Sequence, residues 1–243
     1  MSNVACNREL AQSHKPVSDR LEKLIQQCMD NFDVGDPAAE WPNNILSRHT
    51  TIYSNGVIGQ RGEAVQLEVD RRELALCRRL AVQAEKLMAG IEIGMGSESS
   101  DEFCGFFMPV VIGELPPKTI DEKLIRSRFG GNIFPHATIT VEPLAEQESW
   151  WDEVAADLDF ETKREKENYL RPWRKMIRWF QLCPQFVSRA FIRIGSDENM
   201  WDVWETKELP EGSELTPSTF PRMALGLTKN GSLVGLFSIC VNT

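Results

Sequence analysis

The sequence predicts an α+β fold, built as a single domain around a largely antiparallel or mixed sheet with about five helices and seven strands. Helical and strand periodicities occupy separate stretches with few regular strand–helix–strand units, which favours helices segregated from an antiparallel sheet. Two Asn-Gly pairs stand between apolar runs, where they accept the positive φ of tight hairpins. No repeat or linker divides the chain, so we expect a flexible tail over residues 1–16 and one domain over 17–243.

Composition limits the classes of function. Hydrophobic residues make up 42% and charged residues 26%, which is the ordinary globular mixture and excludes a chain disordered throughout. The net charge of −9 argues against general binding to nucleic acid or anionic membranes, since both functions use excess Lys and Arg. The first residues lack the apolar core of a signal peptide, and no window is apolar enough to span a membrane. We therefore expect an intracellular, cytoplasmic protein with reduced thiols.

The elements before residue 70 are predicted from caps and turns. A helix over 17–32 follows Ser18 as its cap, and the Asp36-Pro37 pair is typical of a second helix start. The Asn55-Gly56 pair predicts a hairpin turn. Apolar and polar residues then alternate over 65–69, as in a half-buried strand.

Residues 70–90 predict a long helix. Asp70 and Glu73 have the spacing of a capping box, and Gly90 stands where a left-handed residue would end the helix. One apolar row contains Leu74, Cys77, Ala81, Ala84 and Met88, and a second row contains Leu76, Leu80 and Leu87. Two rows make an apolar surface wider than a coiled-coil seam, which favours a core helix over an oligomerisation helix.

An acidic, glycine-containing loop follows, and then a buried strand over 103–112. Thr119 and Glu122 again have capping-box spacing and predict a short helix ending at Gly130-Gly131. Alternating apolar residues predict the next strand over 133–142.

Two tryptophan-containing helices are predicted within 146–186, followed by a strand pair over 186–194 and 200–206. A polar loop over 207–219 leads to the clearest strand signal of the chain. Here the runs RMALGLT and SLVGLFSICV flank Asn230-Gly231, which predicts a terminal hairpin.

The segment 146–186 carries the main functional prediction, because it holds four of the seven tryptophans and changes from acidic to basic along its length. Its second helix places a cationic stripe beside an apolar face that contains Met176, Ile177 and Phe180. Such a surface can bind a phosphate, a nucleic-acid backbone or an acidic partner, and its tryptophans offer flat faces for stacking or cation–π contact. The predicted partner-binding residues are Arg171, Trp173, Arg174, Lys175, Arg178, Trp179, Trp150 and Trp151. The competing interpretation is that the stripe pairs with carboxylates of the preceding helix.

An enzyme is the alternative class. His136 stands at the start of a predicted strand, where an imidazole can act as acid or base on an anionic small molecule held by Arg174 or Arg178. The assisting carboxylate would come from Glu98, Asp101 or Glu102. His136 has no neighbouring motif, so a structural role at a strand end is the competing interpretation.

The cysteines lack metal or redox spacing, and the Gly94-Met95-Gly96-Ser97 stretch lacks the strand before it and the helix after it that a dinucleotide site needs. We therefore expect no metal and no cofactor. The function predicted first is a non-enzymatic interaction or regulatory protein that binds another protein rather than nucleic acid. A third class is an oligomeric assembly component, which would need the Leu74/Cys77/Ala81 row to be exposed. The sequence leaves the oligomeric state open.

Overall fold

The computed structural model describes residues 52–54, 57–59, 70–98, 101–110, 113, 115–129, 138–156, 158–195 and 219–241. The helices within these ranges are α3 (Arg71–Leu87), α4 (Glu122–Phe129), α5 (Ser149–Glu153) and α6 (Lys163–Leu182). The strands are β1 (Ile52–Ser54), β2 (Val57–Gly59), β3 (Cys104–Met108), β4 (Ile139–Pro143), β5 (Phe186–Ile194), β6 (Thr219–Thr228) and β7 (Leu233–Val241). The α+β prediction is confirmed, with four helices in the described ranges against about five expected. The predicted tail over 1–16, the helices over 17–32 and from Asp36, and the strand over 65–69 lie outside them.

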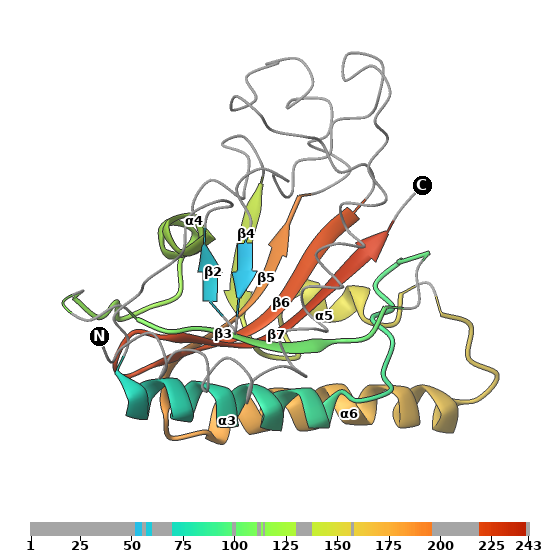
Figure 1. Ribbon diagram of the computed structural model, residues 1–243. Coiled ribbons are helices and arrows are strands. Elements are labelled where there is room, and N and C mark those ends of the chain that lie inside the picture. The colour runs from blue at the N-terminus through green and yellow to red at the C-terminus, as the bar shows by residue number, and fades with distance from the viewer. Residues whose placement is uncertain are drawn as a thin grey trace, which may run out of the picture.

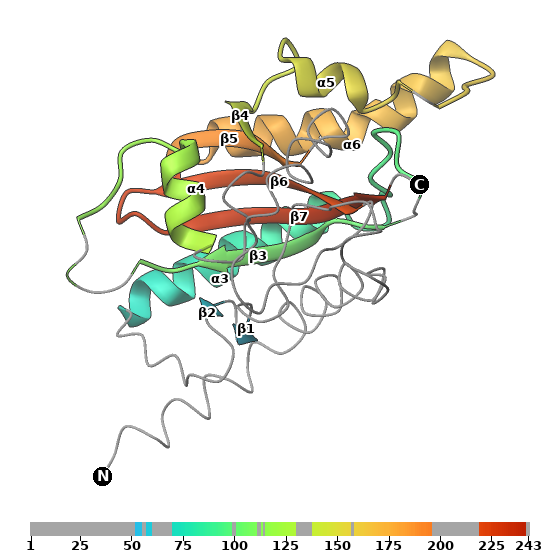
Figure 2. The same ribbon diagram turned by 90° about the horizontal axis from the view of Figure 1, so that it is seen from above.

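Five strands form one antiparallel sheet in the order β3-β7-β6-β5-β4, and β1 and β2 pair as a separate hairpin. Helices α3 and α6 lie side by side on one face of the larger sheet, whereas α4 lies on the other side (Figures 1 and 2). Glu73 of α3 bonds to Thr228, and Phe186, just after α6, pairs with Thr228. The start of α3 and the end of α6 therefore share one end of the sheet, so the two helices run antiparallel.

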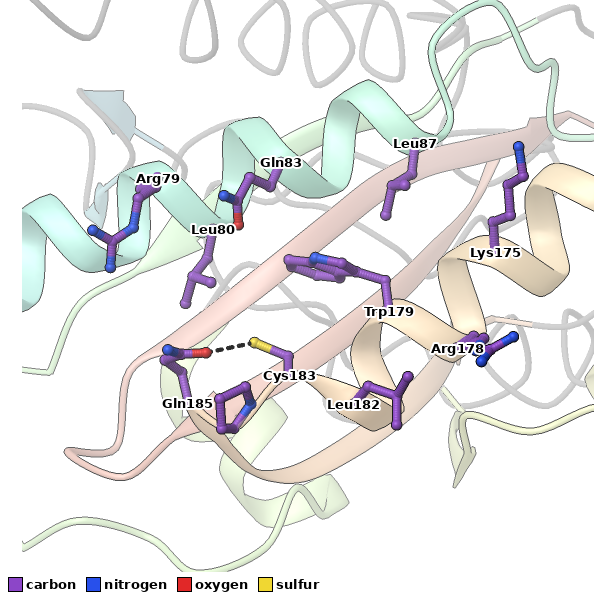
Figure 3. A pocket seen from close by; sticks show the side chains of 11 residues that line it. Arg79, Leu80, Gln83, Leu87, Lys175, Arg178, Trp179, Leu182, Cys183 and Gln185 are labelled. Atoms are coloured by element: carbon purple, nitrogen blue, oxygen red, sulfur yellow. Dashed lines mark hydrogen bonds between the residues drawn. The ribbon is translucent and has the colours of Figure 1, made fainter.

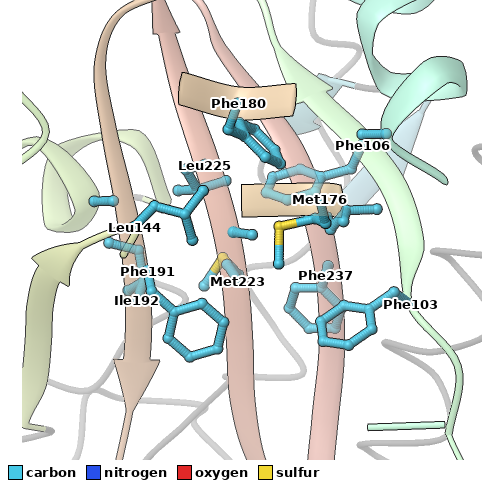
Figure 4. Close-up of a cluster of buried hydrophobic side chains, with 14 of the residues drawn as sticks. Phe103, Phe106, Leu144, Met176, Phe180, Phe191, Ile192, Met223, Leu225 and Phe237 are labelled. Atoms are coloured by element: carbon cyan, nitrogen blue, oxygen red, sulfur yellow. The ribbon is translucent and has the colours of Figure 1, made fainter. Parts of the chain in front are cut away.

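The central strands β6 and β7 form the terminal hairpin that Asn230-Gly231 predicts, with Gly231 at φ 96°. Every residue from Phe220 to Thr228 and from Ser232 to Cys240 is buried. These strands are therefore covered on both faces, which explains their continuous apolar runs. Figure 4 shows part of this core, where α6 contributes Phe180 and Met176.

Small residues bring α3 close to the sheet. A Cβ atom at Gly105 of β3 would lie 2.5 Å from the carbonyl oxygen of Ala81, so only glycine fits there. The Glu85 side chain accepts a hydrogen bond of 2.8 Å from the Gly105 backbone N–H. Because β3 is an edge strand, this carboxylate satisfies a donor that no neighbouring strand of the sheet takes.

One of the two interactions of the capping box predicted at the start of α3 is present. Asp70 is the cap, and its Oδ1 accepts from the backbone N–H groups of Arg72 and Glu73 at 2.8 and 2.9 Å. The Glu73 side chain does not complete a capping box. It is buried, and it accepts hydrogen bonds of 2.6 Å from both the Thr228 hydroxyl and the Asn230 amide. The Glu73 carboxylate therefore bonds to the β6–β7 hairpin instead of capping its own helix, and this contact joins α3 to the hairpin turn.

Two other local predictions change. Asp121, not Thr119, caps α4, because its Oδ1 accepts from the Leu124 N–H at 2.7 Å. Strand β5 has the predicted range, but its described neighbours are β4 and β6, and residues 200–206 lie outside the described part. The strand predicted over 133–142 is described from Ile139 onward.

Candidate interaction surface

Helix α6 positions the cationic stripe. Thr162 caps its start by accepting from the Glu165 N–H at 3.1 Å. At its other end, the Arg189 guanidinium donates to the carbonyls of Phe180 and Cys183 at 2.8 and 2.9 Å. Side chains therefore cap both ends of the helix, which gives its surface side chains a fixed support.

Two predicted partner-binding tryptophans are core residues. Trp150 is fully buried, stacks on Phe191 with 4.2 Å between ring centroids, and donates from Nε1 to the Pro143 carbonyl. Trp173 is also fully buried and meets Phe103 edge-on at 5.2 Å. In this structure neither ring reaches the surface, so neither is available to a partner.

Arg174 and Trp151 contact each other and the chain itself. The Arg174 guanidinium forms ion pairs with Glu146 at 2.8 Å and Glu167 at 2.5 Å, and lies 5.7 Å from the Trp151 ring centroid. The hydrogen bonds that Arg174 donates to Glu146 and Glu167 raise its pKa above the ordinary value. For this one arginine, the self-pairing interpretation describes the structure.

The remaining stripe faces outward. Arg171, Lys175 and Arg178 are exposed, and no ion pair joins them to any residue in the part of the chain that the structure describes. Beside them, Trp179 is half-buried and Leu182 is 68% exposed. A large apolar side chain left this exposed next to cations is a feature of interaction surfaces.

Four of these residues, Lys175, Arg178, Trp179 and Leu182, form one wall of a groove between α3 and α6, with a volume of about 630 Å³ (Figure 3). We call it the α3/α6 groove. Its lining is Arg79, Leu80, Gln83 and Leu87 from α3, Lys175, Arg178, Trp179 and Leu182 from α6, and Cys183, Pro184 and Gln185 after α6. A second hollow of about 550 Å³ follows α3 and shares Arg79 and Gln83.

The lining residues of the α3/α6 groove include no carboxylate, because the acidic residues of both helices lie elsewhere. The two carboxylates of α3, Glu73 and Glu85, bond to the sheet and its hairpin turn. In α6, Glu165 and Glu167 stand near the start of the helix, and no acidic residue occurs from 171 to 182. The groove therefore combines an apolar floor with cations on both walls, in a chain of net charge −9.

The contribution of α3 was not predicted. The sequence assigned this helix to the core, and its row Cys77, Ala81 and Ala84 is indeed fully buried. The sequence feature that could have predicted this contribution is the second apolar row, because two of its members, Leu80 and Leu87, line the groove. Of the Leu74/Cys77/Ala81 row that an assembly component would expose, Cys77 and Ala81 are fully buried, whereas Leu74 is half-buried and lines the second hollow.

The three candidate carboxylates of the enzyme alternative lie outside the lining of the α3/α6 groove. His136 lies outside the described residues. Asp101 is buried, Glu102 accepts from the Gly90 N–H at 3.2 Å, and neither they nor Glu98 lines the α3/α6 groove. No group of three or more His, Cys, Asp or Glu side chains among the described residues is placed to hold a metal ion.

The loop around Gly94 has a structural explanation. Gly94, Met95 and Gly96 all have positive φ, between 59° and 69°, and Met95 is buried. A Cβ atom at Gly94 would lie 2.4 Å from the Tyr169 hydroxyl, so the glycine admits close packing against α6. The Tyr169 hydroxyl donates to the Val154 carbonyl at 3.1 Å. Burial raises the pKa of this tyrosine.

None of the helices in the described ranges is long and apolar enough to cross a membrane. The four described cysteines, Cys77, Cys104, Cys183 and Cys240, are free thiols. None of the protein families compared with this chain matches it, and no curated protein sequence is significantly similar to it.

Proposed function

We propose that this chain is a non-enzymatic interaction or regulatory protein that binds another protein through the outer surface of α6. The observation that carries the proposal is the cluster of Arg178, Lys175, Trp179 and Leu182 along the α3/α6 groove, with exposed cations beside an accessible apolar wall. Arg and Trp are enriched among the residues that contribute most to binding at protein interfaces.

The Trp179 ring is held in place by neighbouring aromatic side chains, which favours binding of a partner without a change in the conformation of this ring. Its ring meets Phe186 edge-on, with 5.8 Å between centroids, and Phe186 lies in the sheet. A rigid aromatic side chain loses little conformational entropy when a partner covers it. The surface therefore offers a prepared apolar anchor with cations around it.

Affinity purification from the native lysate tests this proposal. The chain with Arg178→Glu and Leu182→Asp is compared with a control chain that carries Arg164→Glu and Leu158→Asp. The control makes the same charge changes at exposed positions that do not line the groove. We expect the unaltered and control chains to retain a stoichiometric partner that the groove variant loses, with equal thermal unfolding for all three. Retention of the same proteins by both variants would overturn the proposal.

A further inference from the structure

We propose that the occupant of the α3/α6 groove is an acidic, amphipathic helical segment of another protein. The inference rests on the proposed function and adds the chemistry and the secondary structure of the partner. Three observations support it: the shape of the groove, the distribution of charge along its walls, and the unfavourable charge of the other obvious occupant, a second copy of this chain.

The groove has the shape that accepts a helix. Its walls are two antiparallel helices, and the depression between two packed helices is filled most closely by the side-chain ridge of a third. The lining runs from Arg79 to Leu87 on α3, which is eight residue steps, and from Lys175 to Leu182 on α6, which is seven. Eight residue steps of helix extend about 12 Å, which equals roughly two turns. A bound helix would therefore insert apolar side chains at positions i, i+3 or i+4, and i+7.

The charge of the walls selects an acidic segment. Arg79 stands on the α3 wall, and Lys175 and Arg178 stand on the α6 wall, with Leu80, Leu87 and Trp179 between them. Carboxylates on both flanks of the apolar stripe of a bound helix would meet these cations. Complementary charge raises the association rate and fixes the register of the bound helix, and salt screens both effects.

A second copy of this chain is a poorer occupant. In a two-fold dimer the same patch meets itself, so the three groove cations of one copy would face those of the other. Arg79, Lys175 and Arg178 have no ion-pair partner among the described residues that could offset this repulsion. An acidic segment of a different protein would replace this repulsion between cations with attraction.

The test uses a fluorescent synthetic peptide of roughly 15 residues, the length at which isolated helices become marginally stable. Leucines form one stripe of the peptide and glutamates flank it. Two matched peptides replace all leucines by serine or all glutamates by lysine. Fluorescence anisotropy with the full chain measures affinity at two salt concentrations. We expect binding of the acidic amphipathic peptide alone, and weaker binding at the higher salt.

The variants locate the bound peptide. Arg178→Glu should weaken binding by about tenfold, because an attraction becomes a repulsion at the groove wall. Arg164→Glu changes the net charge equally, but it lies in the first turn of α6 and should leave affinity nearly unchanged. Leu182→Asp should weaken binding, and the exposed control Leu158→Asp should not.

Several results would overturn the inference. The first is absence of binding by the acidic amphipathic peptide, and the second is an equal effect of Arg178→Glu and Arg164→Glu. Concentration-dependent dimerisation that Arg178→Glu abolishes would assign the groove to a second copy. Residues 197–214 of this chain contain seven carboxylates and one lysine. A rise in peptide affinity after their neutralisation would assign the groove to the chain's own segment.

The two proposals fail separately. If the lysate partner depends on Arg178 while the acidic peptide does not bind, the protein-docking function stands and the acidic-helix inference is wrong. If the peptide binds with the expected variant pattern while no lysate protein depends on the groove, the groove has the inferred chemistry and the proposed function fails.

Discussion

Burial controls the chemistry of two cysteine side chains. The pKa of Cys77 is raised to about 12, first by burial and then by the neighbouring Glu73 carboxylate. Burial likewise raises the pKa of Cys240 to about 11, against an opposing effect of Arg222. Because the thiolate is the nucleophile, both side chains should resist alkylation in the folded protein at neutral pH.

These thiols give the folded protein a specific sensitivity to alkali. In the unfolded chain each ionises near pH 9, whereas the folded state keeps the proton, so unfolding releases protons above that pH. The stabilising contribution is complete below pH 9 and is lost as pH rises toward 11 and 12. Each thiol should lower the free energy of unfolding by up to about 1.4 kcal/mol per pH unit in that window.

Urea unfolding of the native chain and of Cys77→Ala at several pH values above 9 measures this contribution. The cavity that alanine leaves shifts the free energy of unfolding at every pH, so the readout is the slope against pH. We expect a shallower slope for Cys77→Ala. Equal slopes would show that Cys77 ionises as readily in the folded state as in the unfolded chain.

Sequence reasoning at single residues succeeded where local geometry decides. The cap predicted at Asp70 is present, because its side chain accepts from the backbone N–H groups of Arg72 and Glu73. Sequence reasoning could not predict that the Glu73 side chain would be buried. The partners of that carboxylate, Thr228 and Asn230, follow it by 155 and 157 residues, and no local pattern records such a distant contact.

At the level of the elements, α4 offers a direct comparison between a sequence pattern and the cap that forms. Thr119 has capping-box spacing to Glu122, but the side chain that bonds to the first turn belongs to Asp121. Loss of a helix cap costs about 1 kcal/mol. We therefore expect Asp121→Ala to lower the free energy of unfolding by about that amount, and Thr119→Ala to change it by only a few tenths.

Urea denaturation of the two variants beside the unaltered chain measures the difference, with circular dichroism at equilibrium as the probe. Both substitutions truncate an exposed side chain in the same short segment, so each serves as the control for the other. A larger loss for Thr119→Ala would restore the capping-box interpretation of this helix.

Elements with strong periodicity were predicted closely, and α3, β5 and the β6–β7 hairpin have nearly the expected ranges. The groove was not predictable in the same way. It depends on Arg79 of one helix and Arg178 of another, which are 99 positions apart in sequence and meet only because both helices lie on one sheet face. Periodicity gives the apolar face of each helix, but not which helix lies beside it.

For the whole molecule, the order of strands predicts where the fold is most protected. Strands β6 and β7 lie inside the sheet and are buried from Phe220 to Thr228 and from Leu233 to Cys240, whereas β3 and β4 lie at the edges. Amides of central strands open only in global unfolding, and edge segments also open locally. Hydrogen exchange followed by mass spectrometry should therefore show the slowest exchange in peptides from 220–240 and faster exchange in peptides covering β4. Slower exchange in β4 would contradict this order.

The same strand order has a consequence for synthesis on the ribosome. Strand β3 is made before its partner in the sheet, β7, and α4, α5, α6 and three other strands come between them in the chain. Until β7 emerges, the apolar faces of α3 and β3 have no finished sheet to cover, and the Glu73 carboxylate has no hairpin turn to bond. The central sheet therefore forms only after β7 has been synthesised, and a nascent chain stopped before β7 presents exposed apolar surface of the kind that chaperones bind.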